Sequence, residues 1–205
     1  MNTPAHIALN LLALARSPRS SPSESLQPTA SANRVNPIPP VLIGAIIPDA
    51  LMFVFYAIEK LIRGTPEILI WSERYYDPIW QYWFDITNSL PLMAVGLAVA
   101  LWTRSQWWGL LFGSMILHVL GDLPLHHDDA HRHFLPLSDW RFISPVSYWD
   151  TDHYGGIVSV LEAIAVLVSC VILWQRSTSP MTKGIMLMLG SSYGLFILYV
   201  IWVWA

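Results

Sequence analysis

The chain has 205 residues, of which 54% are hydrophobic and only 12% are charged, and its formal net charge is −3. A soluble domain carries about 25% charged residues, so this composition predicts one integral membrane domain over residues 1–205. With no basic tract, nucleic acid is excluded as an expected partner. The single cysteine, Cys170, lies in an apolar run, so we expect neither an internal disulfide nor a disulfide-linked partner.

The first half of the chain predicts two apolar helices separated by a polar segment. Residues 3–15 form a short apolar stretch, which we expect to be half-buried or packed against a helical bundle. Residues 16–40 are rich in Ser and Pro without apolar periodicity, which predicts a flexible linker. Residues 41–62 are long enough to span a bilayer. Residues 64–89 combine aromatic and acidic side chains, which predicts an amphipathic segment at the membrane interface.

The second half adds four more apolar stretches and a long polar loop. The stretches cover residues 90–103, 107–125, 156–174 and 183–204. The sequence therefore predicts an all-α, polytopic membrane protein with about five to six apolar helices. Residues 126–155 are rich in His, Asp and Trp, and they form a connection that is unusually long for a compact domain. We therefore expect an ordered loop that lies over a metal site. Counting spans places this loop on the same side of the membrane as residue 6.

The end of the 107–125 stretch carries the main chemical signal. His118 and Asp122 are four residues apart, so on a helix they project from one face. An ionisable group in hydrocarbon needs a partner. Pro124 then ends the helix, and His126 and His127 follow directly. Imidazole and carboxylate are ligands for zinc, iron or manganese. The alternative is an ordinary buried His–Asp pair followed by a solvated His-rich loop.

Other helices end on the same side and bring further ligands. Asp49 follows Pro48 within an apolar helix and needs a cation or a donor there. A divalent ion, with zinc first and manganese or iron as alternatives, is therefore the predicted cofactor. The predicted metal ligands are His6, Asp49, His118, Asp122 and His126, and the predicted general acid–base residues are His127, His153 and Glu162.

Three motifs resemble one known family. They are Thr3-Pro-Ala-His6, Gly44-Ala-Ile-Ile-Pro48-Asp49 and His118-Val-Leu-Gly-Asp122. This set resembles the membrane-bound metal-dependent hydrolases, also catalogued as LexA-binding inner-membrane hydrolases. The resemblance implies a hydrolase of the bacterial inner membrane. Many members have Thr-His-Ser-Leu where this chain has Thr87-Asn88-Ser89-Leu90, so an amide replaces an imidazole here.

A more distant similarity to zinc-dependent phospholipase C suggests phosphoester chemistry. We therefore expect a membrane-embedded, metal-dependent hydrolase that acts on a phosphoester or lipid at the membrane surface, with membrane lipid as its partner. Two non-enzymatic alternatives stay open: a metal-handling or transport protein, and a structural or assembly factor whose His–Asp contacts hold helices together. The long loop on the ligand side favours the enzyme.

Overall fold

The computed structural model describes residues 1–15 and 35–204, and the described part is helical, with no strand. The all-α prediction is confirmed. The predicted linker at 16–40 falls mostly on residues outside this part. Its last three residues belong to a helix that begins at Ile38, which corrects the predicted boundary. Prolines at 39 and 40 are compatible with this start because the first helical turn needs no amide hydrogen.

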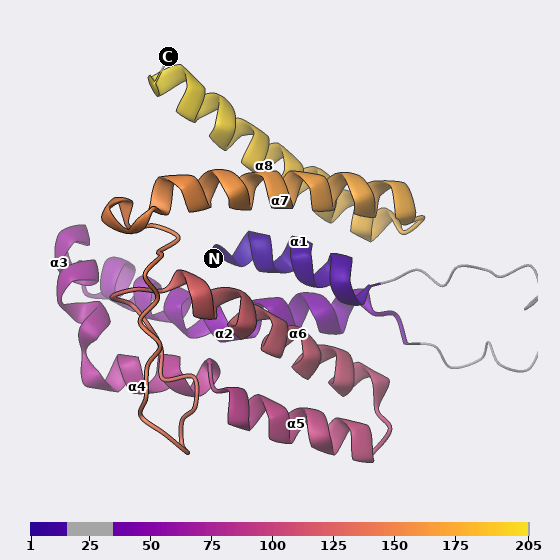
Figure 1. The fold of residues 1–205 in the computed structure, drawn as a ribbon, viewed down its shortest axis with the longest axis horizontal. Helices are drawn as coiled ribbons and strands as arrows, with labels where there is room; N and C mark the ends of the chain where they lie inside the picture. The colour runs from indigo at the N-terminus through magenta and orange to yellow at the C-terminus, as the bar shows by residue number, and fades with distance from the viewer. Residues whose placement is uncertain (16–34, 205) are drawn as a thin grey trace, which may run out of the picture.

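Within residues 35–204, the helices follow one another with short connections, apart from the loop between the sixth and seventh α-helices (Figure 1). In chain order they are α1 (Thr3–Leu14), α2 (Ile38–Ala57), the π-helical η2 (Ile58–Ile62), α3 (Glu67–Ser72), the 3₁₀ turn η3 (Arg74–Tyr76), α4 (Pro78–Thr87), α5 (Leu90–Trp102), α6 (Gln106–Asp122), the 3₁₀ turns η4 (Leu123–Leu125) and η5 (Thr151–His153), α7 (Gly155–Arg176) and α8 (Pro180–Trp204).

In the part of the chain that the structure describes, five helical stretches are long and apolar enough to cross a membrane, which makes the chain an integral membrane protein. They are Ile38–Ile62, Pro78–Trp102, Gln106–Leu125, Gly155–Arg176 and Pro180–Tyr199. The outer face of α7 exposes Ile157, Leu161, Ile164 and Val168. Such an apolar face is stable against lipid tails but would be costly in water.

The segment at 64–89 differs from its prediction. Only its first part, α3 and η3, forms short helices beside the bundle end, whereas α4 runs almost directly into α5. Together α4 and α5 make one of the five candidate spans, interrupted at Asn88 and Ser89. Both polar side chains are buried and bonded: Asn88 donates to Phe84 O at 3.0 Å, and Ser89 caps α5 by accepting from Leu92 N at 3.3 Å. A polar break inside an apolar span is tolerated when its groups are satisfied in this way.

The short helix α1 lies in the middle of the bundle, between α2 and α6 on one side and α7 and α8 on the other (Figure 1). Its Ala5, Ala8 and Leu11 are completely buried and pack in one cluster with Val41 of α2 and Val166 of α7. Small side chains allow such close helix contacts in a membrane. The prediction that residues 3–15 pack against the bundle is confirmed, and α1 thereby holds His6 in the interior.

The loop between α6 and α7 crosses one end of the bundle and is ordered by backbone hydrogen bonds (Figure 1). Ser144 N donates to His126 O at 3.0 Å and Tyr148 N donates to Leu125 O at 3.0 Å, which folds the loop back on its own start. Leu90 N donates to His133 O at 2.9 Å and ties the loop to α5. The loop is therefore a fixed part of the fold.

Candidate metal site

The site depends on a close approach of α2 and α6. A Cβ atom at Gly44 would lie 2.4 Å from Leu111 O and 2.8 Å from Ser114 Cβ, so only glycine fits at this crossing. Ser114 Oγ then donates to Val41 O at 2.7 Å, and Asn10 Nδ2 of α1 donates to Ser114 O at 2.8 Å. These bonds fix the three helices that carry the ligands relative to one another.

His118 is completely buried, and its orientation is set by a backbone carbonyl. Its Nδ1 is 2.8 Å from Ala45 O. A carbonyl only accepts, so Nδ1 carries the hydrogen and Nε2 is left to face the carboxylates. Nε2 lies 3.0 Å from Asp122 Oδ2 and 3.3 Å from Asp49 Oδ1, yet it has no hydrogen-bond partner. A neutral imidazole would direct a lone pair at two carboxylates, so this position requires a cation, either a proton or a metal ion.

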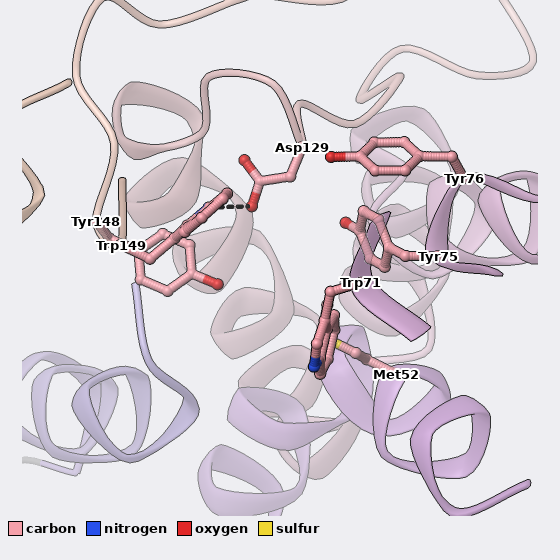
Figure 2. A pocket seen from close by; sticks show the side chains of 7 residues that line it. All are labelled: Met52, Trp71, Tyr75, Tyr76, Asp129, Tyr148 and Trp149. Carbon is pink, nitrogen blue, oxygen red and sulfur yellow. Dashed lines mark hydrogen bonds between the residues drawn. The ribbon is translucent and has the colours of Figure 1, made fainter. Parts of the chain in front are cut away.

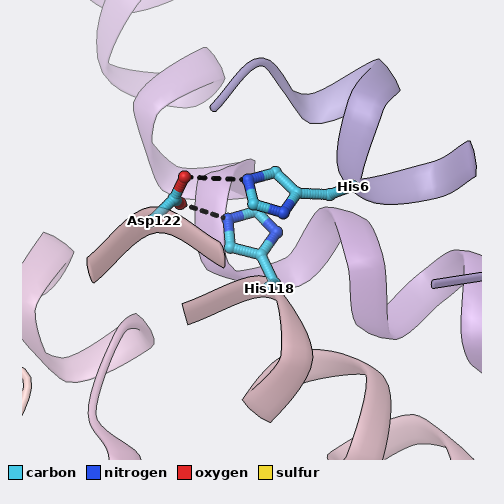
Figure 3. Close-up of side chains that lie close together, drawn as sticks. All are labelled: His6, His118 and Asp122. Atoms are coloured by element: carbon cyan, nitrogen blue, oxygen red, sulfur yellow. Dashed lines mark hydrogen bonds and ion pairs between the residues drawn. The ribbon is translucent and has the colours of Figure 1, made fainter. Parts of the chain in front are cut away.

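His6 completes a group of three ligands (Figure 3). Its ring stacks on His118, with centroids 3.5 Å apart and planes at 12°. His6 Nε2 is 2.9 Å from Asp122 Oδ1. His6, His118 and Asp122 are all buried, and each offers one ligand atom within 4.8 Å of the others. This group can hold a metal ion.

The other two predicted ligands border this group. Asp49 accepts a hydrogen bond from Thr3 Oγ1 in addition to facing His118. His126 Nε2 is 3.4 Å from Asp122 Oδ1, and neither ring nitrogen of His126 has a hydrogen-bond partner. The structure thus brings all five predicted ligands together, from α1, α2, α6 and the start of the loop. The amino group of Met1 also forms an ion pair with Asp122.

The donor set fits a divalent cation. Two carboxylates face each other across imidazole nitrogens in the bundle interior, where an uncompensated negative charge is expensive. A buried polar atom without a hydrogen bond costs about 1–3 kcal/mol, and the unpartnered nitrogens here include His6 Nδ1 and His118 Nε2. Burial alone would lower the pKa of His126, but the nearby carboxylates Asp122 and Asp129 raise it to about 9. The carboxylates around His126 therefore favour a positive charge at this position.

Two of the three predicted acid–base residues lie together in the loop. The rings of His127 and His153 stack with centroids 3.6 Å apart. His127 Nδ1 is 2.6 Å from Ser144 O, and His153 Nδ1 is 2.6 Å from Asp150 Oδ2. These contacts are made within the loop rather than with the metal ligands, so the catalytic role of the pair stays a prediction.

Glu162, the third predicted acid–base residue, holds the start of α1. Its Oε2 accepts from Asn2 N at 3.0 Å, and its Oε1 accepts from Asn2 Nδ2 and Tyr193 OH, both at 2.7 Å. Each carboxylate oxygen therefore has a donor. Its acid–base role also stays a prediction.

The sequence did not indicate the structural contacts of three polar residues around the ligands. Asp85 is fully buried, accepts from Arg132 N at 2.9 Å and Arg132 Nε at 2.5 Å, and so fixes the loop. Asn88, which stands where many members of the family with similar motifs have His, is not a member of the three-ligand group, and its backbone carbonyl oxygen lies 3.3 Å from His133 Nδ1. Asp129 lies 3.0 Å from His126 Nδ1. Only its spacing three residues after His126 could have indicated this contact.

Comparisons with protein-family models, with curated proteins and with solved structures found no match.

Proposed function

We propose that this protein is a membrane-embedded, metal-dependent hydrolase that acts on a phosphoester, in a lipid or a small molecule, at the membrane surface. The motif resemblance supports the reaction class and the bacterial inner membrane as its location. The ligand set of imidazole and carboxylate without thiolate supports zinc as the ion, with manganese or iron as alternatives.

The observation that carries the proposal is the environment of His118 Nε2. It is buried, has no hydrogen-bond partner, and faces carboxylate oxygens of Asp49 and Asp122. A structural His–Asp pair would satisfy itself with one linear hydrogen bond and would not need a second carboxylate. An imidazole nitrogen that faces two carboxylates in this way forms, together with them, a set of ligands for one cation.

Each residue of the cluster has a role in this proposal. His6, His118, Asp49 and Asp122 hold the ion, and Ala45 O and Thr3 Oγ1 orient two of them. A divalent ion in such a site supplies Lewis acidity that polarises a phosphoryl oxygen and activates water near neutral pH. His126 stands at the border between the cluster and the loop, where it can orient a substrate oxygen.

The position of the cluster favours hydrolysis over transport. The ligands lie where α6 ends and the ordered loop begins, at one end of the bundle (Figure 1). A transport site needs access from both sides of the membrane, near its midplane. A site under a loop at one end suits an enzyme that meets its substrate at the surface.

The test is an Asp49→Asn variant, which keeps the shape of the side chain but removes its charge. We expect elemental analysis of purified wild type to find bound zinc, manganese or iron, and Asp49→Asn to lose about tenfold or more in metal affinity. Hydrolysis of a panel of phospholipids and generic phosphodiesters should fall with it. Asp139→Asn is the control, because that loop carboxylate is 82% exposed and pairs only with Arg132.

Two outcomes would contradict the proposal. Equal metal content in wild type and in a His118→Ala, Asp122→Ala double variant would exclude the site. Bound metal without turnover of any ester in the panel would favour the metal-handling alternative.

A further inference from the structure

A cavity of about 410 Å³ lies at the loop end of the bundle, near the candidate metal ligands (Figure 2). This volume is in the range of sites that bind small molecules, about 300–1,000 Å³. Five aromatic side chains and one acid make most of its wall: Trp71, Tyr75, Tyr76, Asp129, Tyr148 and Trp149. The wall therefore combines two segments far apart in sequence, the α3–η3 region and the loop.

The aromatic rings offer neutral faces on an open cavity. Trp71 and Tyr76 are each 42% exposed and Trp149 is 52% exposed, so ligands can enter between them, whereas Tyr75 is buried at the base. Burial, with a contribution from Asp128, raises the pKa of Tyr76 to about 12. Burial also raises the pKa of Tyr75 and Tyr148 well above the usual value. The phenols stay uncharged at physiological pH.

Asp129 is the only acid among the residues that line this cavity, and only one of its two carboxylate oxygens has a polar partner. Its Oδ2 accepts from Trp149 Nε1 at 3.2 Å and lies 3.0 Å from His126 Nδ1. Its Oδ1 is buried without a hydrogen-bond partner, and the residue as a whole is only 8% exposed. Figure 2 shows the carboxylate between Trp149 and Tyr76. A buried carboxylate oxygen of this kind needs a donor or a cation.

The wall chemistry selects one class of ligand. Aromatic faces attract a cation within about 6 Å of the ring centroid, and cages of such rings are the known means of binding quaternary ammonium groups. An anion would be repelled by Asp129, and a purely apolar ligand would leave Asp129 Oδ1 unpaired. We propose that this cavity binds an organic ammonium group, such as the choline or ethanolamine end of a phospholipid headgroup.

The cavity is connected to the candidate metal ligands through Asp129, one of its lining residues. Asp129 contacts His126, and His126 contacts Asp122, so two side-chain contacts connect the cavity to a metal ligand. In a choline or ethanolamine headgroup two carbons separate the nitrogen from the phosphate ester oxygen. A headgroup whose ammonium is bound in the cavity and whose phosphate is turned towards His126 would bring the phosphate near the candidate metal ligands. This second step rests on the proposed hydrolase function, whereas ammonium binding does not.

The test measures binding first, on the full chain in detergent with a metal chelator present. Choline and ethanolamine are titrated against 3,3-dimethylbutan-1-ol, a neutral alcohol with the shape of choline, with tryptophan fluorescence and calorimetry as readouts. We expect at least one ammonium to bind about tenfold tighter than the alcohol. Asp129→Asn should remove that preference, and Trp149→Leu should weaken binding of the ammonium. Trp140→Leu is the matched control, because Trp140 is an exposed loop tryptophan outside the cavity.

Equal binding of choline, ethanolamine and the neutral alcohol, or an unchanged ammonium preference in Asp129→Asn, would overturn the inference. The second arm compares hydrolysis of vesicles of phosphatidylcholine, phosphatidylethanolamine and phosphatidylglycerol, and we expect the glycerol headgroup to be the poorest substrate. Ammonium binding without hydrolysis would refute the proposed function alone. Hydrolysis that does not discriminate the headgroups, in a chain that binds no ammonium, would refute the inference alone.

Discussion

At the scale of single residues, His133 shows how the loop interior controls charge. It is only 2% exposed, and burial, followed by repulsion from His131, lowers its pKa to about 4. Its unfolded pKa is about 6.5, so the folded state disfavours the proton. The stability that His133 contributes is therefore complete above about pH 6.5 and is lost as the pH falls from there towards 4.

We predict that wild type loses about 2 kcal/mol more than His133→Gln when the pH is lowered from 7 to 5, because Gln cannot take up a proton. Gln also keeps an amide that can donate to the Asn88 carbonyl. Unfolding of the detergent-solubilised protein, followed by circular dichroism at several pH values, measures the difference. Parallel pH profiles for the two proteins would show that His133 is not held neutral.

The contacts among the candidate metal ligands could be predicted only where the residues are close together in the sequence. His118 and Asp122 are one helical turn apart, so their contact needs no knowledge of the tertiary fold. The roles of Ala45 O and Asp129 Oδ1 could not be predicted in this way. Every residue has a backbone carbonyl, and an acid in a polar loop usually faces water. The proposed ammonium cavity depends on the segments at 71–76 and 129–149, which are far apart in the sequence, and no local pattern indicates their contact.

At the scale of elements, the contact of α2 with α6 decides whether the ligands meet. Gly44→Ala would drive a methyl group into Leu111 O, which is backbone and cannot move aside. We predict a loss of about 1–3 kcal/mol in stability from this overpacking, together with reduced metal content, because Asp49 moves away from His118. Thermal unfolding and elemental analysis of the purified variant give both quantities.

Gly113→Ala is the matched control, because a Cβ atom at Gly113 on α6 would meet nothing within 4 Å. Alanine favours helix over glycine, so this variant should be as stable as wild type or slightly more so. Equal losses in Gly44→Ala and Gly113→Ala would mean that the close helix crossing is not what limits stability.

The apolar helices were predictable because the length of an apolar run reflects the thickness of the bilayer. The exception is α4, whose polar and aromatic residues predicted an interfacial segment. Its buried Asp85 is paired with Arg132 from the loop, and Asn88, at the end of α4, donates to Pro48 O of α2 at 3.4 Å. The polar groups of α4 are satisfied by partners from other elements, which the sequence of α4 alone does not contain.

At the scale of the whole molecule, the loop and the α5–α6 and α7–α8 turns lie at opposite ends (Figure 1). We predict that single cysteines at Thr103 and Thr178, in a Cys170→Ser background, react with an impermeant thiol reagent from the same side of the membrane. A cysteine at Trp140 should react only from the other side. All three substituted positions are exposed. Labelling of all three from one side would refute the arrangement of spans.

The central position of α1 has a consequence for how the protein is assembled. This helix precedes the other described helices along the chain, yet its surroundings are complete only when α7 is in place, as the bond between Asn2 and Glu162, 160 residues apart, shows. Such long-range contacts form late and slowly. His6 is therefore fully enclosed beside Asp122 only after α7 has packed against α1. Under the proposed function, ion binding by His6, His118 and Asp122 would therefore be coupled to completion of the bundle, and a chain that stops before α7 would leave α1 without one of the helices that cover it.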